Sequence, residues 1–240
     1  MNIALIGYGK MGKAIEKIAE ERGHTVVLIC NSELSVQHAD FSNVEMAIEF
    51  SQPSFVLNHI NFCLDRKIPV IVGTTGWNDY LSEIQEKIKQ KDGSLLHASN
   101  FSVGVNLFFE LNKKLAQLIN GNTNYTASIE EVHHIQKLDA PSGTAITIAE
   151  GIIENNQNYN EWVLGKDEIP QTNPKQLGLT AYRLPDVPGT HIVKYVSDID
   201  TISIAHEAHN RKGFALGAVI AAEFLLGKKG EFQMNDVLNF

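Results

Sequence analysis

A glycine-rich turn lies between the first apolar run and the first helical pattern of this 240-residue chain. The run Ile3–Ile6 leads into Gly7-x-Gly9-x-x-Gly12, and Met11–Arg22 then shows helical spacing of its apolar residues. In this context Gly7 permits a tight turn, Gly9 lets the backbone approach a pyrophosphate, and Gly12 lets helix and strand pack closely. The pyrophosphate would rest on the amides and the positive end of the helix. The pattern therefore predicts a dinucleotide-binding βαβ unit.

The alternation of strands and helices continues to about residue 100. Apolar runs predict strands at Thr25–Cys30, Val44–Phe50, Ile68–Val72 and Ser94–Ala98, and helical patterns predict helices at Ser54–Asp65 and Asn78–Lys91. Strands that alternate with helices are typical of a parallel sheet with right-handed crossovers. We therefore expect an α/β fold built on a Rossmann-like, doubly wound parallel sheet.

The turns that follow the predicted strands share a small, polar composition. Besides the glycine turn they are Cys30-Asn31-Ser32, Phe50-Ser51-Gln52-Pro53, Gly73-Thr74-Thr75-Gly76 and Ala98-Ser99-Asn100-Phe101. In a parallel sheet these turns all lie at the carboxyl edge, where such folds bind ligands. A single one is ordinary turn chemistry, but their repetition on one edge predicts a continuous binding cleft.

The pattern changes after Phe101. Helices are expected at Val103–Ile119 and from Ser142 to about Glu154, and strands at Tyr125–His133, Leu179–Leu184, His191–Val196 and Thr201–His206. Helix-length gaps are absent between the last three strands, so we expect them to run antiparallel with the first in an open mixed sheet. This predicts a second, smaller α+β domain.

Two further segments complete the predicted organisation. The polar stretch Asn155–Lys175, with Pro170 and Pro174, is interpreted as an excursion from the sheet. The apolar helix Phe214–Leu226 has the length to pack back on the first domain. The expected boundaries are therefore 1–103 with 212–240 for the dinucleotide-binding domain, and 104–211 for the second domain.

Composition excludes several partners. The formal net charge of −8 argues against nucleic acid or an anionic membrane, since both require a basic face. The two cysteines, Cys30 and Cys63, lie in apolar segments without CxxC spacing and read as reduced core thiols. Phe214–Leu226 is too short to span a bilayer. We expect a soluble, cytoplasmic protein.

A basic cluster interrupts this acidic chain. His133, His134 and Lys137 precede Pro141-Ser142-Gly143-Thr144, which opens a predicted helix. A helix start beside two imidazoles and an ammonium favours a small anion, and the imidazoles can move protons near neutral pH. An isolated His-His pair is more often a surface feature, but its combination with a helix start indicates a binding or catalytic site.

The same block carries a family resemblance. Glu131-x-His133-His134-x-x-Lys137-x-Asp139-Ala140-Pro141-Ser142-Gly143-Thr144-Ala145 resembles the signature of 4-hydroxy-tetrahydrodipicolinate reductase, also called dihydrodipicolinate reductase. The resemblance extends to Phe50-Ser51-x-Pro53, Val72–Gly76, Ala98–Asn106 and Asn210-Arg211 through Gly217-Ala218. It implies reduction of 4-hydroxy-tetrahydrodipicolinate with loss of water, in diaminopimelate and lysine biosynthesis.

The resemblance also implies roles for residues. His133 would be the proton donor and acceptor and Lys137 the second proton donor, while His134, Gly143 and Thr144 would bind the substrate, a cyclic dicarboxylate. The cofactor, NADPH or NADH, would be bound by Gly7, Tyr8, Gly9, Lys10, Met11, Gly12, Gly73, Thr74, Thr75, Ala98, Ser99, Asn100 and Phe101. The family is usually a homotetramer assembled through its substrate domains.

Cofactor preference stays open. The acid that holds the adenosine ribose in NAD-binding folds is expected at the end of the second strand, but Asn31-Ser32 stands there and Glu33 follows one residue later. Lys10 has the charge to meet a ribose 2′-phosphate, which tilts the prediction slightly toward NADPH. A solvated lysine at a helix start is an equally good interpretation.

Three alternatives remain. A metal site among the histidines is disfavoured, because adjacent histidines on an extended segment point to opposite faces and no Cys or carboxylate has ligand spacing. Another amino-acid dehydrogenase, such as a diaminopimelate dehydrogenase, would not need His133, His134 and Lys137 together. A non-catalytic nicotinamide sensor would have no use for proton donors.

Overall fold

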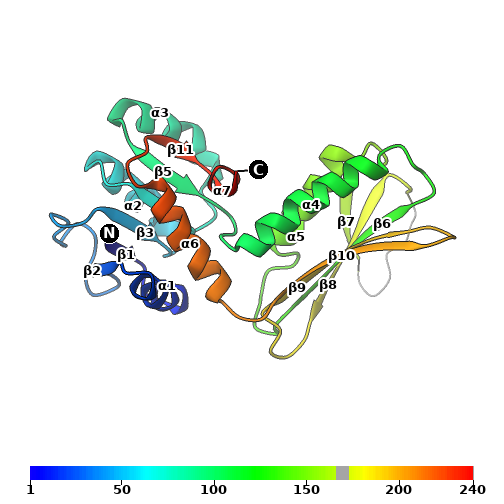
Figure 1. Ribbon diagram of the computed structural model, residues 1–240, viewed down its shortest axis with the longest axis horizontal. Helices are drawn as coiled ribbons and strands as arrows, with labels where there is room; N and C mark the ends of the chain where they lie inside the picture. Colours follow the sequence, from blue (N-terminus) through cyan, green and yellow to red (C-terminus); the bar gives the residue numbers. More distant parts are fainter. Residues whose placement is uncertain (166–172, 240) are drawn as a thin grey trace. The chain divides into compact units, whose positions relative to one another are not determined.

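The computed structural model describes residues 1–165 and 173–239, and divides the chain into two compact units (Figure 1). The first unit comprises Met1–Val103 with Arg211–Phe240, and the second comprises Gly104–Asn210. Of the predicted excursion at Asn155–Lys175, Pro170 lies outside the described residues. Among the residues described, no helix combines the length and apolar character needed to cross a bilayer.

The first unit contains a six-stranded sheet in the order β11-β5-β4-β3-β1-β2, with every neighbouring pair parallel. Its strands are β1 (Asn2–Ile6), β2 (Thr25–Cys30), β3 (Met46–Glu49), β4 (Val70–Val72), β5 (Ser94–His97) and β11 (Gly230–Phe232). Its helices are α1 (Lys10–Glu21), α2 (Pro53–Asp65), the 3-10 helix η1 (Asn78–Tyr80), α3 (Leu81–Lys91), α6 (Lys212–Leu225) and α7 (Met234–Leu238). The predicted Rossmann-like parallel sheet is confirmed.

Helices cover both faces of this sheet, because its strands are apolar on both sides. In β1, Ala4 and Ile6 pack in the core cluster that holds α2 and α3, whereas Ile3 and Leu5 pack in the cluster that holds α1 and α6. Burying a side chain as large as isoleucine or leucine contributes roughly 1.5–3 kcal/mol. Helix α6, which corresponds to the predicted helix Phe214–Leu226, thus packs on the first sheet, as predicted.

The second unit contains a mixed sheet in the order β10-β9-β6-β8-β7. Its strands are β6 (Thr126–His133), β7 (Glu161–Gly165), β8 (Gln176–Arg183), β9 (Gly189–Val196) and β10 (Thr201–Ala208), and its helices are α4 (Val103–Ile119) and α5 (Gly143–Asn155). The open mixed sheet is confirmed. The expectation that all later strands run antiparallel with β6 is wrong, because β8 pairs with β6 in parallel.

The direction of β8 follows from its connection. The chain leaves β6, passes through α5 and β7, and only then enters β8, which is a crossover long enough for parallel pairing. Part of the predicted excursion is in fact strand β7, which pairs in parallel with β8. The direction of β8 and the presence of β7 therefore depend on how the chain returns to the sheet and not on local composition.

Helices α4 and α5 pack against one face of the second sheet. In β6 the buried positions alternate, so Ala127 and Ile129 point into this core. Two residues further along, Glu131 and His133 lie on the same buried face. The alternation that builds the core therefore also carries a carboxylate and an imidazole toward the start of α5.

Candidate active site

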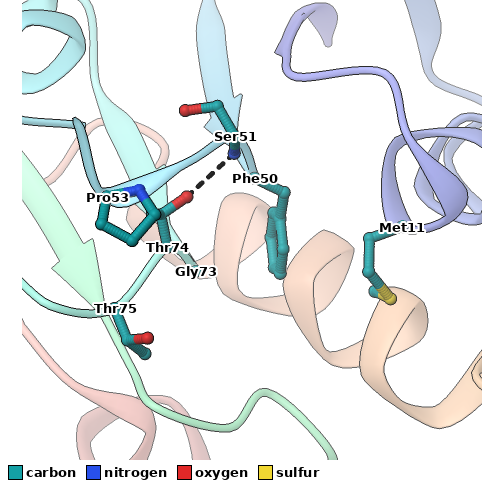
Figure 2. Close-up of a pocket in the computed structure, with 7 residues that line it drawn as sticks. All are labelled: Met11, Phe50, Ser51, Pro53, Gly73, Thr74 and Thr75. Atoms are coloured by element: carbon teal, nitrogen blue, oxygen red, sulfur yellow. Dashed lines mark hydrogen bonds between the residues drawn. The ribbon is translucent and has the colours of Figure 1, made fainter. Parts of the chain in front are cut away.

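A pocket of about 260 Å³ lies in the first unit where the strands end (Figure 2). It is lined by Met11, Phe50, Ser51, Pro53, Gly73, Thr74 and Thr75. These residues come from the start of α1 and from the segments that follow β3 and β4. Three of the predicted polar turns therefore contribute to the pocket, at the edge where parallel sheets bind ligands.

The glycine turn has the geometry that its motif requires. Gly7 has a φ of +95°, and a Cβ there would lie 2.2 Å from the carbonyl oxygen of Phe50. A Cβ at Gly12 would lie 2.4 Å from the carbonyl oxygen of Gly7. At Gly9, by contrast, no atom lies within 4 Å of the Cβ position. The turn is closed where the backbone packs and open at the helix start, which fits a pyrophosphate.

Hydrogen bonds fix the pocket lining. The Ser51 amide donates to Thr74 Oγ1 at 2.8 Å, the contact dashed in Figure 2. Trp77 Nε1 donates to the Thr74 carbonyl at 2.9 Å. A Cβ at Gly73 would lie 2.2 Å from the Phe50 ring, so the ring can pack there only against glycine. Thr74 is therefore held from two sides at the end of β4.

A buried carboxylate lies beside this pocket. Glu49, the last residue of β3, is fully buried and accepts a hydrogen bond from the Ser51 hydroxyl. His59 of α2 places Nδ1 3.1 Å from the same carboxylate oxygen. Neither residue was predicted to act here, although the position of Glu49 directly before the Phe50-Ser51 turn was a usable signal.

The other predicted cofactor residues lie at the same edge. Ala98, Ser99, Asn100 and Phe101 follow β5, and the Phe101 ring packs against Phe50 with centroids 5.7 Å apart. The Tyr8 hydroxyl donates to Glu16, and Lys10 is exposed at the start of α1. After β2, Asn31 Oδ1 accepts from the amides of Glu33 and Leu34 in an Asx turn. The Asn31 side chain is thus already engaged by its own backbone.

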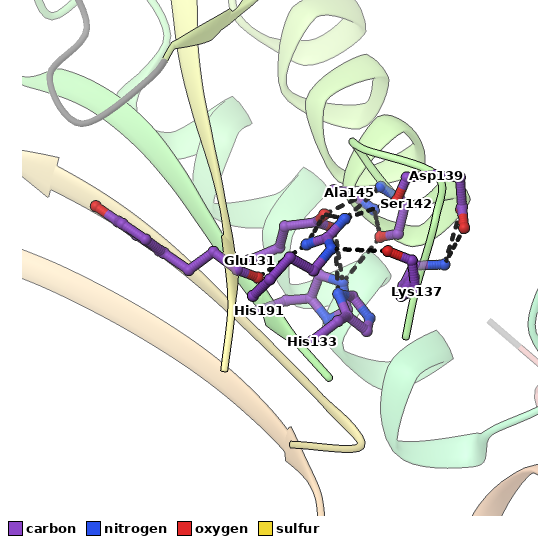
Figure 3. Close-up of polar contacts among 9 residues, drawn as sticks. Glu131, His133, Lys137, Asp139, Ser142, Ala145 and His191 are labelled. Carbon is purple, nitrogen blue, oxygen red and sulfur yellow. Dashed lines mark hydrogen bonds and ion pairs between the residues drawn. The ribbon is translucent and has the colours of Figure 1, made fainter. Parts of the chain in front are cut away.

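The second unit brings a carboxylate to the start of α5 (Figure 3). Glu131 is fully buried and accepts from the Ser142 amide at 3.0 Å. Its Oε1 also accepts from both terminal nitrogens of Arg183 at 3.3 Å. Ser142 in turn caps α5, since its Oγ accepts from the Ala145 amide at 3.1 Å. Glu131 therefore links β6, β8 and the start of α5.

Two imidazoles contact the same carboxylate. His133 Nδ1 lies 3.6 Å and His191 Nε2 lies 3.7 Å from Glu131 Oε2. Burial lowers the pKa of His133, and the negative charge of Glu131 opposes this shift. Burial lowers the pKa of His191 to about 3, so this imidazole is neutral at physiological pH. Of the two, only His133 has the charge of Glu131 among the causes that raise its pKa against the effect of burial.

Lys137 is held by an acidic partner. Its Nζ donates to both carboxylate oxygens of Asp139, at 2.9 and 2.7 Å. The pKa of Asp139 is lowered because its carboxylate accepts these bonds. Arg183 braces the backbone of the same loop, donating to the carbonyl of Asp139 at 2.6 Å and to that of Lys137 at 3.3 Å.

The predicted substrate residues flank this network. Gly143 and Thr144 are the first residues of α5, directly after the Ser142 cap. A Cβ at Gly143 would meet no atom within 4 Å, so the helix start is open on that side. His134 follows β6, and its carbonyl accepts from the Lys137 amide at 3.0 Å. The structure thus brings His133, Lys137 and the α5 start together in one unit.

Glu131, His133 and His191 also form a group with metal-ligand chemistry. Their potential ligand atoms lie within 4.8 Å of one another. Both oxygens of Glu131 already accept hydrogen bonds, and one of them faces the fixed positive charge of Arg183. A guanidinium repels a cation at this position. We therefore interpret the group as a polar network around a buried carboxylate, with both imidazoles within ion-pair distance of it.

Family models match nearly the whole chain. The model described as dihydrodipicolinate reductase, N-terminus, matches residues 1–101, and that described as dihydrodipicolinate reductase, C-terminus, matches residues 104–238. The chain belongs to the dihydrodipicolinate reductase family. The resemblance read from the His133-to-Ala145 block is thereby confirmed.

Relatives within the dihydrodipicolinate reductase family cover the full chain. The 4-hydroxy-tetrahydrodipicolinate reductase of Christiangramia forsetii is 47% identical over 242 residues, covering 100% of this chain and 98% of the relative. That of Alkaliphilus oremlandii is 33% identical, covering 100% and 99%. This family member is therefore an oxidoreductase that uses NADH or NADPH.

A solved structure supports the fold. The dipicolinate-bound dihydrodipicolinate reductase from Paenisporosarcina sp. TG-14 aligns with a TM-score of 0.73 over 97% of each chain, at 20% identity. This agreement confirms the predicted fold class, a Rossmann-like parallel sheet plus a second unit with a mixed sheet.

Proposed function

We propose that this protein reduces 4-hydroxy-tetrahydrodipicolinate to tetrahydrodipicolinate with loss of water, at the expense of NADPH or NADH, in diaminopimelate and lysine biosynthesis. The observation that carries the proposal is the cluster in the second unit, where His133 and Lys137 lie at the open start of α5. Full-length relatives that carry this activity in their names support it.

The α5 start is proposed to bind a substrate carboxylate. Gly143 and Thr144 present amides there, and the Ser142 cap fixes the first turn through the Ala145 amide. His134 and Lys137 add charge-assisted hydrogen bonds to the anion. The Paenisporosarcina relative is described with bound dipicolinate, a ring with two carboxylates, which supports this class of ligand.

His133 and Lys137 are proposed to move the protons. Burial lowers the pKa of His133, and the negative charge of Glu131 opposes this effect and so favours the protonated imidazole. A protonated imidazole is a suitable acid for protonating the neighbouring substrate atom on which electron density accumulates after the hydride has been delivered. The Lys137 ammonium, oriented by Asp139, is proposed as the acid for loss of the hydroxyl as water.

The first unit is proposed to bind the cofactor, whose nicotinamide supplies the hydride when bound. The Gly7–Gly12 turn would hold the pyrophosphate on the amides at the start of α1, in the space left open at Gly9. Tyr8, Lys10 and Met11 lie in the same turn. The pocket residues Gly73, Thr74 and Thr75 and the segment Ala98–Phe101 would contact the rest of the cofactor.

Cofactor preference is proposed to lean slightly to NADPH. Asn31 is engaged in its own turn and offers no acid to a ribose, whereas Lys10 is exposed at the glycine turn. Calorimetric titration of both cofactors at fixed ionic strength tests this. Tighter binding of NADPH than of NADH is expected, and Lys10→Gln should reduce the difference. Equal affinities in the wild type would contradict it.

Further properties are proposed from the family. The first unit serves as the dinucleotide-binding domain, and the second serves substrate binding and assembly into a homotetramer. The protein is proposed to act in the cytoplasm. Sedimentation equilibrium of the purified protein tests the assembly, with four copies expected.

The reaction is tested directly with freshly generated synthase product. The loss of NADPH and NADH absorbance is followed after mixing the purified protein with the product of the synthase reaction, prepared immediately before use. Turnover that needs both the synthase product and this protein is expected. No absorbance loss with either cofactor, from a protein that still binds them, would contradict the proposed reaction.

A further inference from the structure

Glu131 is the centre of the polar network in the second unit. It is fully buried, and four groups from different elements face its carboxylate: the Ser142 amide, the Arg183 guanidinium, and the imidazoles of His133 and His191. A buried carboxylate carries a large desolvation cost unless it is paired. This arrangement pairs it with one fixed cation and leaves a second, reversible cation site at His133.

Strand pairing places both imidazoles beside the carboxylate. His133 lies two residues after Glu131 on the same face of β6. His191 on β9 is the direct antiparallel partner of Glu131. The two rings meet edge to face, with centroids 5.1 Å apart. Burial keeps His191 neutral, so it does not compete with His133 for the negative charge.

Charged groups of both signs face His133. Glu131 on β6 and Asp139 in the following loop are negative, whereas Lys137 in that loop and Arg183 on β8 are positive. The neutral His191 faces it from β9. Of these, Glu131 places its carboxylate 3.6 Å from His133 Nδ1 within the buried network. It is therefore the group best placed to support a positive charge on the imidazole.

The contact also distinguishes the two ring nitrogens. Nδ1 faces Glu131, whereas Nε2 lies toward the start of β9, 3.0 Å from where a Cβ of Gly189 would be. A carboxylate beside Nδ1 favours a proton on that nitrogen. In the neutral ring this leaves Nε2 as the nitrogen able to exchange a proton with a substrate.

We propose that Glu131 is a positioning residue that keeps the proton of His133 on Nδ1 and stabilises the imidazolium, so that Nε2 donates the catalytic proton. This inference rests on the proposed role of His133 as proton donor. In the step, the N–H bond at Nε2 breaks and a C–H bond forms on the substrate. The imidazole is left neutral with its Nδ1 proton facing Glu131, and the buried site keeps one compensated negative charge.

Glu131→Gln tests this role with a nearly isosteric side chain. The amide can still accept from Ser142 but carries no charge. The general acid must be protonated, so kcat falls as pH rises through the pKa of His133 in the complex. Without the Glu131 charge this basic limb should move to lower pH by about one unit, and kcat above it should fall about tenfold, with a smaller change in KM.

Glu130→Gln is the matched control. Glu130 is adjacent in sequence but lies on the other face of β6, where it pairs with Lys194 at 2.7 Å, and both side chains are about one-third exposed. It removes the same charge from the same strand without touching His133. Its pH profile should coincide with that of the wild type. A wild-type profile for Glu131→Gln would overturn the inference while leaving the proposed reaction intact.

A measurement on the wild-type protein covers the case in which Glu131→Gln fails to fold. Nitrogen-15 NMR of the imidazoles reports which ring nitrogen carries the proton, and His133→Gln assigns the signal by its disappearance. The neutral His133 ring is expected to carry its proton on Nδ1. A neutral ring protonated on Nε2 would overturn the inference. Because no turnover is needed, this result is independent of the proposed reaction.

Discussion

Lys137 and Asp139 form an ion pair in which the ammonium donates to both carboxylate oxygens, at 2.9 and 2.7 Å. The two side chains are 22% and 63% exposed, so the pair is only partly shielded from water. Exposed pairs contribute little to stability. The contact is better explained by orientation of the Lys137 amine than by stabilisation of the fold.

Asp139→Asn should therefore affect activity more than stability. The free energy of unfolding is expected to change by less than about 1 kcal/mol. Because the amine is no longer held in place, kcat/KM should fall roughly tenfold. Denaturant titration and steady-state kinetics measure the two effects. A large loss of stability with normal kinetics would contradict this assignment.

Arg183→Gln should instead reduce the stability of the protein strongly. Its guanidinium faces the fully buried Glu131 and also donates to the carbonyls of Lys137 and Asp139. Removing one partner of a buried charge pair leaves the other uncompensated, which costs roughly 3 kcal/mol or more. Denaturant unfolding should show this loss, with Asp139→Asn as the comparison. Equal stability of the two variants would show that Glu131 does not need the guanidinium.

The stability of the second unit should depend on the pH through His191. Burial lowers the folded-state pKa of His191 from 6.5 to about 3. Between these values the unfolded chain binds a proton that the folded chain does not, so stability is present above pH 6.5 and is lost as the pH falls toward 3. This single group should cost about 2 kcal/mol between pH 7 and pH 5.

Hydrogen exchange of the β6 and β9 amides, corrected for the intrinsic pH dependence of exchange, measures this loss. His191 Nε2 lies 3.3 Å from Ser142 Oγ. His191→Gln removes the titrating group and can retain a polar contact with this hydroxyl. Its stability should fall about 2 kcal/mol less than that of the wild type over the same pH range. Parallel pH dependence in both proteins would mean that His191 is not the responsible group.

Two substitutions in the glycine turn should separate an effect on cofactor binding from an effect on stability. Gly9→Ala adds a methyl group where no atom lies within 4 Å, so stability should stay within about 1 kcal/mol of the wild type. The methyl group occupies the approach of the pyrophosphate, and NADPH affinity should fall at least roughly tenfold. Gly7→Ala should instead destabilise the first unit, because its Cβ would lie 2.2 Å from the Phe50 carbonyl oxygen. Calorimetry and denaturant unfolding distinguish the two, and normal binding by Gly9→Ala would contradict the placement.

Much of the fold was predictable because local patterns report it. The apolar run Ile3–Ile6 and the glycine turn predicted the first βαβ unit, and Ser142 predicted the start of α5. Strand β7 was missed because Glu161–Gly165 is short and lies in a polar stretch. The direction of β8 was missed because it depends on how the chain returns from α5, which no local pattern records.

The residues of the site likewise include some that local sequence predicted and others that it did not. His133 and Lys137 were predicted because they lie close together beside a helix start. The involvement of Arg183 and His191 was not predicted, because their contacts with Glu131 arise from strand pairing between segments 52 or more residues apart. Glu131 itself had a usable signal, since it shares the inward alternation of Ala127 and Ile129.

The proton-transfer roles are tested most directly by kinetics of His133→Gln and Lys137→Met with fresh synthase product and saturating NADPH. Binding of dipicolinate to each variant serves as the check on folding. Loss of a general acid typically lowers turnover by about 10²–10⁴-fold. We expect kcat to fall by such a factor in both variants, with a smaller change in KM. Unchanged kcat in both variants would contradict the account.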